Sequence, residues 1–518
     1  MRRLVLGLAC TLALGCNLLS GDEGSDASSS ASKRGVKRPL GRPSDPPSPE
    51  GPPLVGEPGT DEHGYPLQRP DSTVLTALLR ARRFADLDAA FEYYQSQFEA
   101  DTRKEHWPRQ AIGSFLVVDE NLKPLLDAWI EASPESFAPL AARGAWHDAM
   151  GWKLRGNASF RKLTDEQRKG LELEHGHAKA DYQRALEWRP KLLAATIALL
   201  QIARTEGNSR EEERLYARAL VQCRTCVSAR SAYVIAQAPR WGGSYPAMDE
   251  AAKVDSALLV ENPKLGILRG WSGFDRCRTA AGNRDHAVAL AQCEAAEAAG
   301  PNPRLLCLHA RVLNAEERHA EALKLVDRAL RLDPQNRECL IAREFARRRT
   351  KDFIGAAEDL LVAWRLDPTD EDTKEGVEWM LERLQYDANQ AAKAGDAALE
   401  GKIRGLADAL SPGSGKRRGP AVATNDAIAE LQAEVAKSPD DFDLHLKLDA
   451  ALVSHGRFDD IVKMWDGFIA THPEHAQAWL ERGGAKLHGK DKEGAQVDFE
   501  KACDLGNDTA CRVARARR

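Results

Sequence analysis

A pattern of small, large and proline residues recurs at one fixed spacing and constrains the fold more than any other feature. In the segment "AEALKLVDRALRLDP", Ala322 and Ala329 are the small residues, Val326 lies between them and Pro334 ends the segment. The same four positions recur 34 residues later as Ala356, Leu360, Ala363 and Pro368. Small residues let two helices cross closely, large ones fill the space between them, and proline ends a helix. The spacing therefore predicts stacked helical hairpins.

The same pattern of residue types occurs in other parts of the chain, and it resembles the tetratricopeptide (TPR) repeat. The fullest match lies near the end, where Trp479, Gly483, Ala495, Phe499 and Ala502 occupy the aromatic, glycine, alanine, aromatic and alanine positions. Further matches are Ala178, Tyr182, Ala185, Pro190, Tyr216 and Ala219. The resemblance implies an all-α fold of TPR-like helical-hairpin repeats, an α-solenoid arranged in two blocks.

Composition agrees with a helical protein. Charged residues make up 29% of the chain and aromatic residues 6%, a mixture that suits helices and suits a β-sandwich poorly. The net charge is -5, with acidic and basic residues interspersed, so nothing points to nucleic acid as a partner.

Changes in composition divide the chain into six segments. Residues 17–70 are rich in Ser, Gly and Pro and lack apolar periodicity, which predicts a disordered tether. The predicted order is a lipoprotein signal peptide (1–16), the tether (17–70), a TPR-like helical domain (72–260), TPR-like repeats (261–408), a linker (409–425) and C-terminal TPR-like repeats (426–518).

The N-terminus has the features of an export signal. Arg2 and Arg3 precede an apolar stretch, residues 4–15, that is too short to span a bilayer. The junction "ALGC" resembles a bacterial lipobox, which implies cleavage before Cys16 and acylation of that cysteine with palmitate. Asn17 then favours the outer membrane, by analogy with enteric bacteria. The alternative is an ordinary signal peptide in which Cys16 is incidental.

Eight further cysteines suggest disulfides in an exported chain, with the connectivity left open. They are Cys223, Cys226, Cys277, Cys293, Cys307, Cys339, Cys503 and Cys511. Pairs between adjacent helices, such as Cys277–Cys293 and Cys307–Cys339, are plausible. Cys223 and Cys226 have redox-motif spacing but follow a helix, which favours a structural disulfide over a redox site.

Two more resemblances concern parts of the chain. The segments "ARRFADLDAAF", "GAWHDAMGWKLRG" and "APRWGGSYPAMDEAA" make residues 75–255 resemble an uncharacterised bacterial TPR-like domain family, which implies a fold and no activity. The segment "KACDLGNDTAC" resembles cysteine-bridged helical repeats of secreted bacterial proteins and implies a Cys503–Cys511 link, the alternative being two unpaired thiols.

The glycine-rich "RWGGSYP" (240–246) is interpreted as a joint between helices rather than a ligand loop.

Motifs for catalysis are lacking, so we expect no enzyme and no cofactor. The sequence holds no zinc-protease HExxH, no G-x-S-x-G elbow and no dinucleotide fingerprint. His175 and His177 could bind a metal only if "HGH" forms a loop or a helix start, because a continuous helix would point them to different faces. The alternative is a solvated helix cap.

The sequence therefore predicts a lipid-anchored envelope scaffold that binds a protein or peptide partner in a groove of its repeats. In the last repeat Trp479, Arg482 and Lys486 share one helix face and are candidate partner-binding residues. The alternatives are an envelope enzyme or metal-dependent hydrolase that uses the first helical domain, and a purely structural spacer lipoprotein.

Overall fold

The computed structural model describes residues 42–46, 50–157, 162–411, 425–453 and 457–516. Cys16, the signal peptide and most of the predicted linker lie outside these residues. The chain forms two compact units. The N-terminal unit comprises Met1–Tyr386 and Gly401–Pro412, and the C-terminal unit comprises Asp387–Glu400 and Gly413–Arg518.

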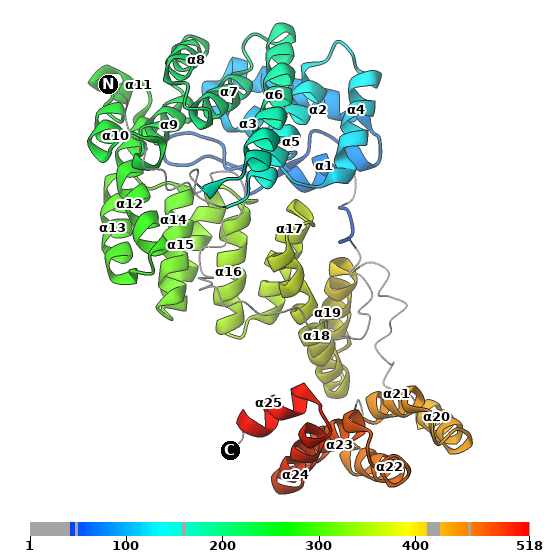
Figure 1. The fold of residues 1–518 in the computed structure, drawn as a ribbon. Coiled ribbons are helices and arrows are strands. Elements are labelled where there is room, and N and C mark those ends of the chain that lie inside the picture. Colours follow the sequence, from blue (N-terminus) through cyan, green and yellow to red (C-terminus); the bar gives the residue numbers. More distant parts are fainter. Residues whose placement is uncertain (1–41, 47–49, 158–161, 412–424, 454–456, 517–518) are drawn as a thin grey trace. The chain divides into compact units, whose positions relative to one another are not determined.

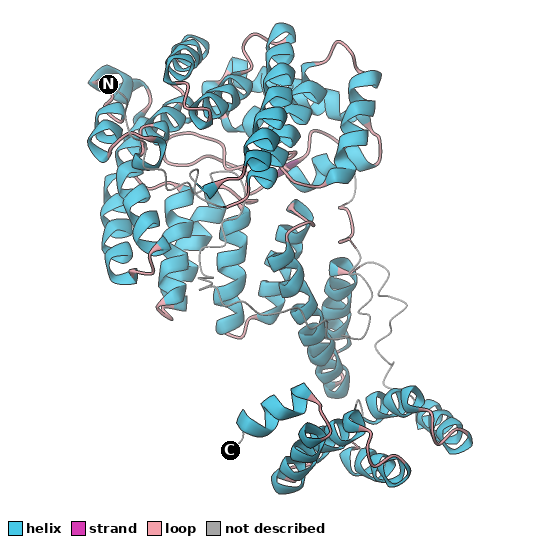
Figure 2. Ribbon diagram, viewed as in Figure 1, coloured by secondary structure: helices cyan, strands magenta, loops and turns pink. Residues whose placement is uncertain are grey.

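Helices make up most of the described chain (Figure 2), which confirms the predicted all-α class. Up to the centre of the chain they are α1 (Ser72–Arg80), α2 (Phe84–Ala100), α3 (His106–Gly113), α4 (Lys123–Ala132), α5 (Phe137–Arg155), α6 (Asp165–Trp188), α7 (Leu193–Thr205), α8 (Ser209–Gln222), α9 (Val227–Ala236), α10 (Tyr245–Ala251) and α11 (Ser256–Glu261). They continue with α12 (Trp271–Gly282), α13 (His286–Ala299), α14 (Pro303–Ala315), α15 (His319–Leu332), α16 (Arg337–Arg349) and α17 (Phe353–Leu366).

The remaining helices lie after α17 in the sequence. They are α18 (Glu371–Ala394), α19 (Ala397–Leu410), α20 (Asn425–Lys437), α21 (Phe442–Val453), α22 (Phe458–Thr471), α23 (Ala476–His488), α24 (Lys492–Asp504) and α25 (Asp508–Ala516). Short 3₁₀ helices are η1 (Thr102–Lys104), η2 (Glu120–Leu122), η4 (Pro239–Trp241) and η5 (Pro263–Gly270).

The positions that recur from hairpin to hairpin form the contacts within each hairpin. Ala322, Val326 and Ala329 on α15 are fully buried, and so are Ala356 and Ala363 on α17. The glycine of the last repeat shows why small residues are needed, because a Cβ on Gly483 would lie 2.7 Å from the Phe499 ring. Periodic small residues therefore set the close helix crossings, as predicted from the spacing.

Residues 50–71, which we call the N-terminal strap, correct the predicted extent of the tether. Strand β1 (Leu54–Val55) pairs antiparallel with β2 (Arg69–Pro70), and Tyr65 is buried. The strap runs inside the N-terminal unit as the blue segment before α1 (Figure 1). Arg69 Nη2 donates to the carbonyl of Leu332, 2.9 Å away on α15. These contacts offset the cost of ordering a segment without periodicity, so residues 50–70 belong to the fold.

All eight described cysteines form disulfides, which settles the connectivity that the sequence leaves open. The pairs are Cys223–Cys226, Cys277–Cys293, Cys307–Cys339 and Cys503–Cys511. The second pair joins the two helices of one hairpin, α12 and α13, and the third joins the first helices of two successive hairpins, α14 and α16.

The "RWGGSYP" segment joins α9 to α10. Gly242 takes a positive φ of 89° after η4, and Ser244 caps α10 by accepting from the N–H of Ala247. A Cβ on Gly243 would lie 2.1 Å from the carbonyl oxygen of Gln237, so only glycine fits there. The segment is therefore a joint in the helical array.

The C-terminal unit has its own core, in which Trp465 is fully buried and belongs to one apolar cluster with Ile461, Phe468 and Leu448. Among the helices of the described chain, none has the length and apolar character needed to cross a bilayer.

A candidate ligand-binding cavity in the N-terminal unit

The N-terminal unit contains a partly open cavity of about 810 Å³. Helices α7, α12, α14 and α16 line it, and each of these is the first helix of a hairpin. The strap, α3, α5, α9 and η5 also contribute to the wall. Successive repeats therefore direct their first helices toward a common space, as expected for a solenoid groove.

The lining is rich in basic side chains. Nine of them face the cavity, against six carboxylates. The basic residues are Arg69, Arg109, Arg204, Lys264, Arg269, Arg278, Arg304, Arg311 and Arg337, and the acidic ones are Asp61, Glu62, Asp148, Asp333, Glu338 and Asp367.

Some of these cations have carboxylate partners. Lys264 Nζ lies 2.6 Å from Asp61 Oδ2, and Arg278 Nη2 lies 2.9 Å from Asp275 Oδ1. Arg337 pairs with Asp370. These pairs hold the strap and the helices of the wall in place.

Arg204 on α7 is buried without such a partner. Its side chain lies over the Trp241 ring at 4.5 Å from the centroid, and the residue is only 6% exposed. Within the described chain, its Nε and Nη1 have no hydrogen-bond acceptor. Burial lowers the pKa of Arg204 to about 10, so the guanidinium stays charged at neutral pH. The joint at residues 240–246 thus supplies the ring that supports a cavity arginine.

Arg109 on α3 and Arg304 in the first turn of α14 face the same space. Burial and the nearby charge of Arg304 lower the pKa of Arg109 to about 10. Neither guanidinium has a hydrogen bond or ion pair among the interactions of the described residues. Arg69 of the strap is 6% exposed, and its Nη1 has no acceptor in the described structure.

Asn302, the N-cap of α14, adds a further donor. Its Oδ1 accepts from the N–H of Leu305 at 3.1 Å, which leaves the amide Nδ2 without a partner in the described part of the chain. Asn302 is only 4% exposed and lines the cavity.

Nearby carboxylates are engaged elsewhere. Glu105 accepts from the N–H groups of Val227 and Ser228 at 2.9 and 2.8 Å, which fixes the start of α9. Asp148 Oδ1 lies 3.2 Å from His175 Nε2. Asp333 accepts from Asn336 Nδ2 at 3.0 Å. The arginines therefore keep donors that these acids do not use.

His175 and His177 do not form the loop that the metal hypothesis required. Helix α6 is continuous through both residues, so they lie on different faces. His175 is 1% exposed, which also excludes a solvated cap there, and the His177 ring lies 5.0 Å from that of His147. In the part of the chain that the structure describes, no three His, Cys, Asp or Glu side chains form a metal-binding group.

Trp479, Arg482 and Lys486 share α23 as predicted, and their polar groups have partners inside the C-terminal unit. Arg482 Nη2 lies 2.7 Å from Asp498 Oδ1, and Lys486 Nζ lies 2.9 Å from Asp498 Oδ2. Trp479 Nε1 donates to the carbonyl of Pro473 at 2.8 Å. A role in partner binding stays a prediction for these three residues.

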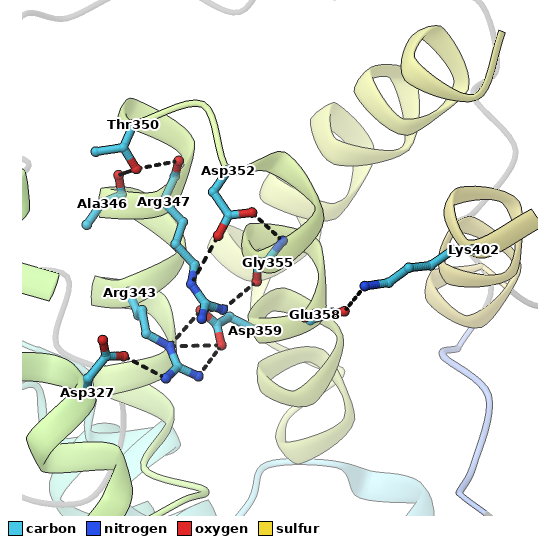
Figure 3. A network of polar contacts seen from close by, with 10 residues as sticks. All are labelled: Asp327, Arg343, Ala346, Arg347, Thr350, Asp352, Gly355, Glu358, Asp359 and Lys402. Carbon is cyan, nitrogen blue, oxygen red and sulfur yellow. Dashed lines mark hydrogen bonds and ion pairs between the residues drawn. The ribbon is translucent and has the colours of Figure 1, made fainter. Parts of the chain in front are cut away.

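The sequence did not single out the cavity arginines, because each looks like an ordinary arginine on a helix surface. The spacing of charged residues in the sequence does indicate a different feature, a set of ion pairs between helices. Arg343 lies 16 residues after Asp327 and 16 residues before Asp359. The same spacing occurs in Asp466, Arg482 and Asp498. In both sets the arginine pairs with both aspartates, and Figure 3 shows the first set.

Comparison with known proteins identifies a matching family for one part of the chain and no activity. Residues 71–210 match the family described as a domain of unknown function (DUF4034). That region contributes Arg109, Asp148 and Arg204 to the cavity. No curated protein matches the chain at a significant level. The fold and the cavity together define an all-α protein of TPR-like helical repeats.

Several solved structures are similar to this chain at low identity. The TPR domain of P58(IPK) is 12% identical, with a TM-score of 0.24, and the match covers 66% of this chain and 92% of that one. Yeast Tom70 is 16% identical, with a TM-score of 0.21 and coverage of 86% and 94%. A human IFIT1 dimer with PPP-AAAA is 12% identical, with a TM-score of 0.23 and coverage of 84% and 91%. The fold assignment rests on this chain's own helices.

Proposed function

We propose that this protein is a scaffold that binds a segment of a partner protein in the cavity of the N-terminal unit. The observation that carries the proposal is the cavity of about 810 Å³ faced by the first helices of successive hairpins. A wall of this kind presents side chains from several repeats to one extended or helical segment. Ala198, Ile235 and Leu308 give it apolar surface beside the basic groups.

We infer further that the scaffold is exported and anchored by lipid on Cys16, in the outer membrane of a bacterial envelope. The lipobox-like "ALGC" supports the anchor, and the four disulfides suit an oxidising compartment. Labelling cells with radioactive palmitate tests it. Cys16→Ser abolishes the label if the proposal is right, and a label that persists in this variant contradicts it.

Binding rather than catalysis is proposed because eight of the nine basic side chains that face the cavity are arginines, which keep their protons at neutral pH and are poor acid–base catalysts. A protein partner is proposed rather than nucleic acid because the whole chain is acidic, at -5, and its unpaired cations lie inside a hollow instead of along an exposed stripe.

Site-specific photocrosslinking tests the proposed scaffold. A photoreactive residue at Ala198, on the cavity wall, is compared with one at Val221, which is 88% exposed on α8 outside the cavity. We expect one discrete adduct from position 198 and none from 221. The crosslinked segment is then synthesised, and its affinity is measured for the unmodified protein and for Ala198→Trp, which fills the cavity.

The proposal requires that Ala198→Trp weakens binding of that segment by at least about tenfold, or about 1.4 kcal/mol. Equal adducts from positions 198 and 221, or equal affinity for the filled cavity, would contradict it.

A further inference from the structure

Buried donors without acceptors gather in the cavity of the N-terminal unit. Arg69, Arg204 and Asn302 are each at least nine-tenths buried and line it. Their partnerless atoms in the described structure are Nη1 of Arg69, Nε and Nη1 of Arg204, and Nδ2 of Asn302. Burying a charged donor without an acceptor is costly, so several at one place indicate an acceptor that the chain itself does not supply.

Like charges also converge there. Burial is the main cause that lowers the pKa of Arg109 and of Arg204, and the charge of Arg304 also opposes the protonation of both. Glu105 and Asp333 at Arg109, and Glu212 and Asp148 at Arg204, act in the opposite direction. Arg304 therefore lies close enough to interact with guanidiniums from two other helices. Repulsion among cations in a partly enclosed space is relieved by a bound anion.

The backbone favours an anion at the same place. Helix α14 spans Pro303–Ala315, and its N-terminal residues Asn302, Pro303 and Arg304 line the cavity. The N-terminus of a helix carries a partial positive charge and directs N–H groups outward. The partnerless Nδ2 of Asn302 lies at this helix end, so dipole and side chain favour the same kind of ligand.

The acids around the cluster do not provide the missing acceptors. Glu105 is held by backbone N–H groups of α9, Asp148 lies against His175, and Asp333 accepts from Asn336. The ligand must therefore bring its own negative charge.

We infer that Arg69, Arg109, Arg204 and Arg304, which we call the arginine cluster, bind a small polyanion carrying two or more phosphate or carboxylate groups. Guanidinium groups match both kinds of oxyanion through paired N–H donors, and four of them suit more than one charge. The ligand is small because the residues Arg69 and Arg204 are each only 6% exposed and a cavity of about 810 Å³ has the size of small-molecule sites. This site goes beyond the proposed partner binding and does not depend on it.

Titration calorimetry on the purified full chain tests the inference, with pyrophosphate and citrate as probes at constant ionic strength. The test variants are Arg204→Gln and Arg304→Gln, and the matched control is Arg184→Gln, which removes an exposed arginine outside the cavity. We expect the unmodified protein to bind at least one probe, with an affinity that each test variant lowers roughly tenfold or more and the control leaves unchanged.

The choice of probe distinguishes the source of the negative charge. Tighter binding of pyrophosphate assigns a phosphate-bearing ligand, and tighter binding of citrate assigns a polycarboxylate. A folded Arg304→Lys variant, checked by its helical circular dichroism, keeps the charge but loses the paired donors and should bind with intermediate affinity.

Absence of binding by both probes, or equal loss of affinity in Arg184→Gln and the cluster variants, overturns the inference. Photocrosslinking of a partner is a separate measurement, so failure of either proposal leaves the other to its own test.

Discussion

Arg343 on α16 and Asp359 on α17 form a bidentate ion pair inside one hairpin, with Nη2 2.6 Å from Oδ1 and Nε 3.0 Å from Oδ2. The same arginine reaches back to Asp327 on α15, in the preceding hairpin, at 2.9 Å (Figure 3). Arg143 does the same with Asp181 and Asp127, and Arg482 with Asp498 and Asp466. One arginine thus joins three helices and fixes the stacking of adjacent repeats.

Asp359→Asn is expected to destabilise the hairpin strongly. The carboxylate is 3% exposed, and its removal leaves Arg343 and Arg347 without their shared counter-charge, at a cost of about 3–5 kcal/mol. Hydrogen exchange of the α17 amides measures the loss. Asp327→Asn is the control, because that side chain is 58% exposed and its pair contributes less than about 1 kcal/mol. Equal losses in the two variants would show that burial does not strengthen the pair.

Removal of the Cys307–Cys339 disulfide should destabilise the N-terminal unit more than removal of Cys223–Cys226. The first closes a loop with a sequence separation of 32 and the second one of 3. Loop-closure entropy then predicts losses of about 3–4 and 1–2 kcal/mol. Thermal unfolding of the two double alanine variants, with and without reductant, measures the difference. A larger loss from the short loop would contradict the entropic argument.

The fold was largely predictable because the contacts within a hairpin are local. The alanines at 322, 329, 356 and 363 became buried crossing points, as their regular spacing indicates. The strap was missed because its order depends on residues far along the chain: Arg69 donates to Leu332, 263 residues away. No local periodicity encodes such a contact.

The cavity could not be predicted from the sequence either, because it also depends on residues that are far apart along the chain. Arg109, Arg204 and Arg304 lie on three separate helices, α3, α7 and α14, and only the tertiary fold brings them to one cavity. Trp479, Arg482 and Lys486 could be placed on one face of α23 from the sequence alone, because helical spacing is local. Their polar groups are hydrogen-bonded or ion-paired within the C-terminal unit.

Arg204→Met is expected to stabilise the ligand-free protein or leave it unchanged. The substitution removes a buried guanidinium with two partnerless nitrogen atoms and keeps an unbranched chain against Trp241. The gain is about 1–2 kcal/mol, because the cost of unmet donors disappears. Thermal unfolding without added anions measures it. A marked loss of stability in this variant would show instead that the arginine is structurally required.

Gly243→Ala should disrupt the joint between α9 and α10. Its Cβ would approach the carbonyl oxygen of Gln237 to 2.1 Å, so the backbone must shift, at a cost of about 2–4 kcal/mol. Gly242→Ala is the comparison, because a Cβ there meets open space and only the positive φ of 89° opposes it, at about 1–2 kcal/mol. Thermal unfolding ranks the two. If Gly242→Ala is the more damaging, the backbone angle and not the close approach controls this joint.

Asp449 makes the stability of the C-terminal unit depend on pH. It lies on α21, accepts a hydrogen bond from Trp465 Nε1 on α22, and has its pKa raised by burial to about 6. Aspartates of the unfolded chain titrate near a pKa of about 4. The folded state therefore holds this proton more tightly, so the stabilising contribution is complete below about pH 4 and is lost as the pH rises through about 6.

Asp449→Asn removes this titration and can still accept from Trp465. We expect the variant to unfold roughly 2–4 °C above the unmodified protein at pH 7 and to lose that advantage near pH 4, since the acid form of Asp449 is neutral as well. Hydrogen exchange of the α22 amides across this pH range follows the C-terminal unit specifically. Asp443→Asn, at an exposed position of the same helix, should show no such pH-dependent difference. An advantage of Asp449→Asn that stays constant from pH 4 to pH 7 would rule out the carboxyl group as its cause.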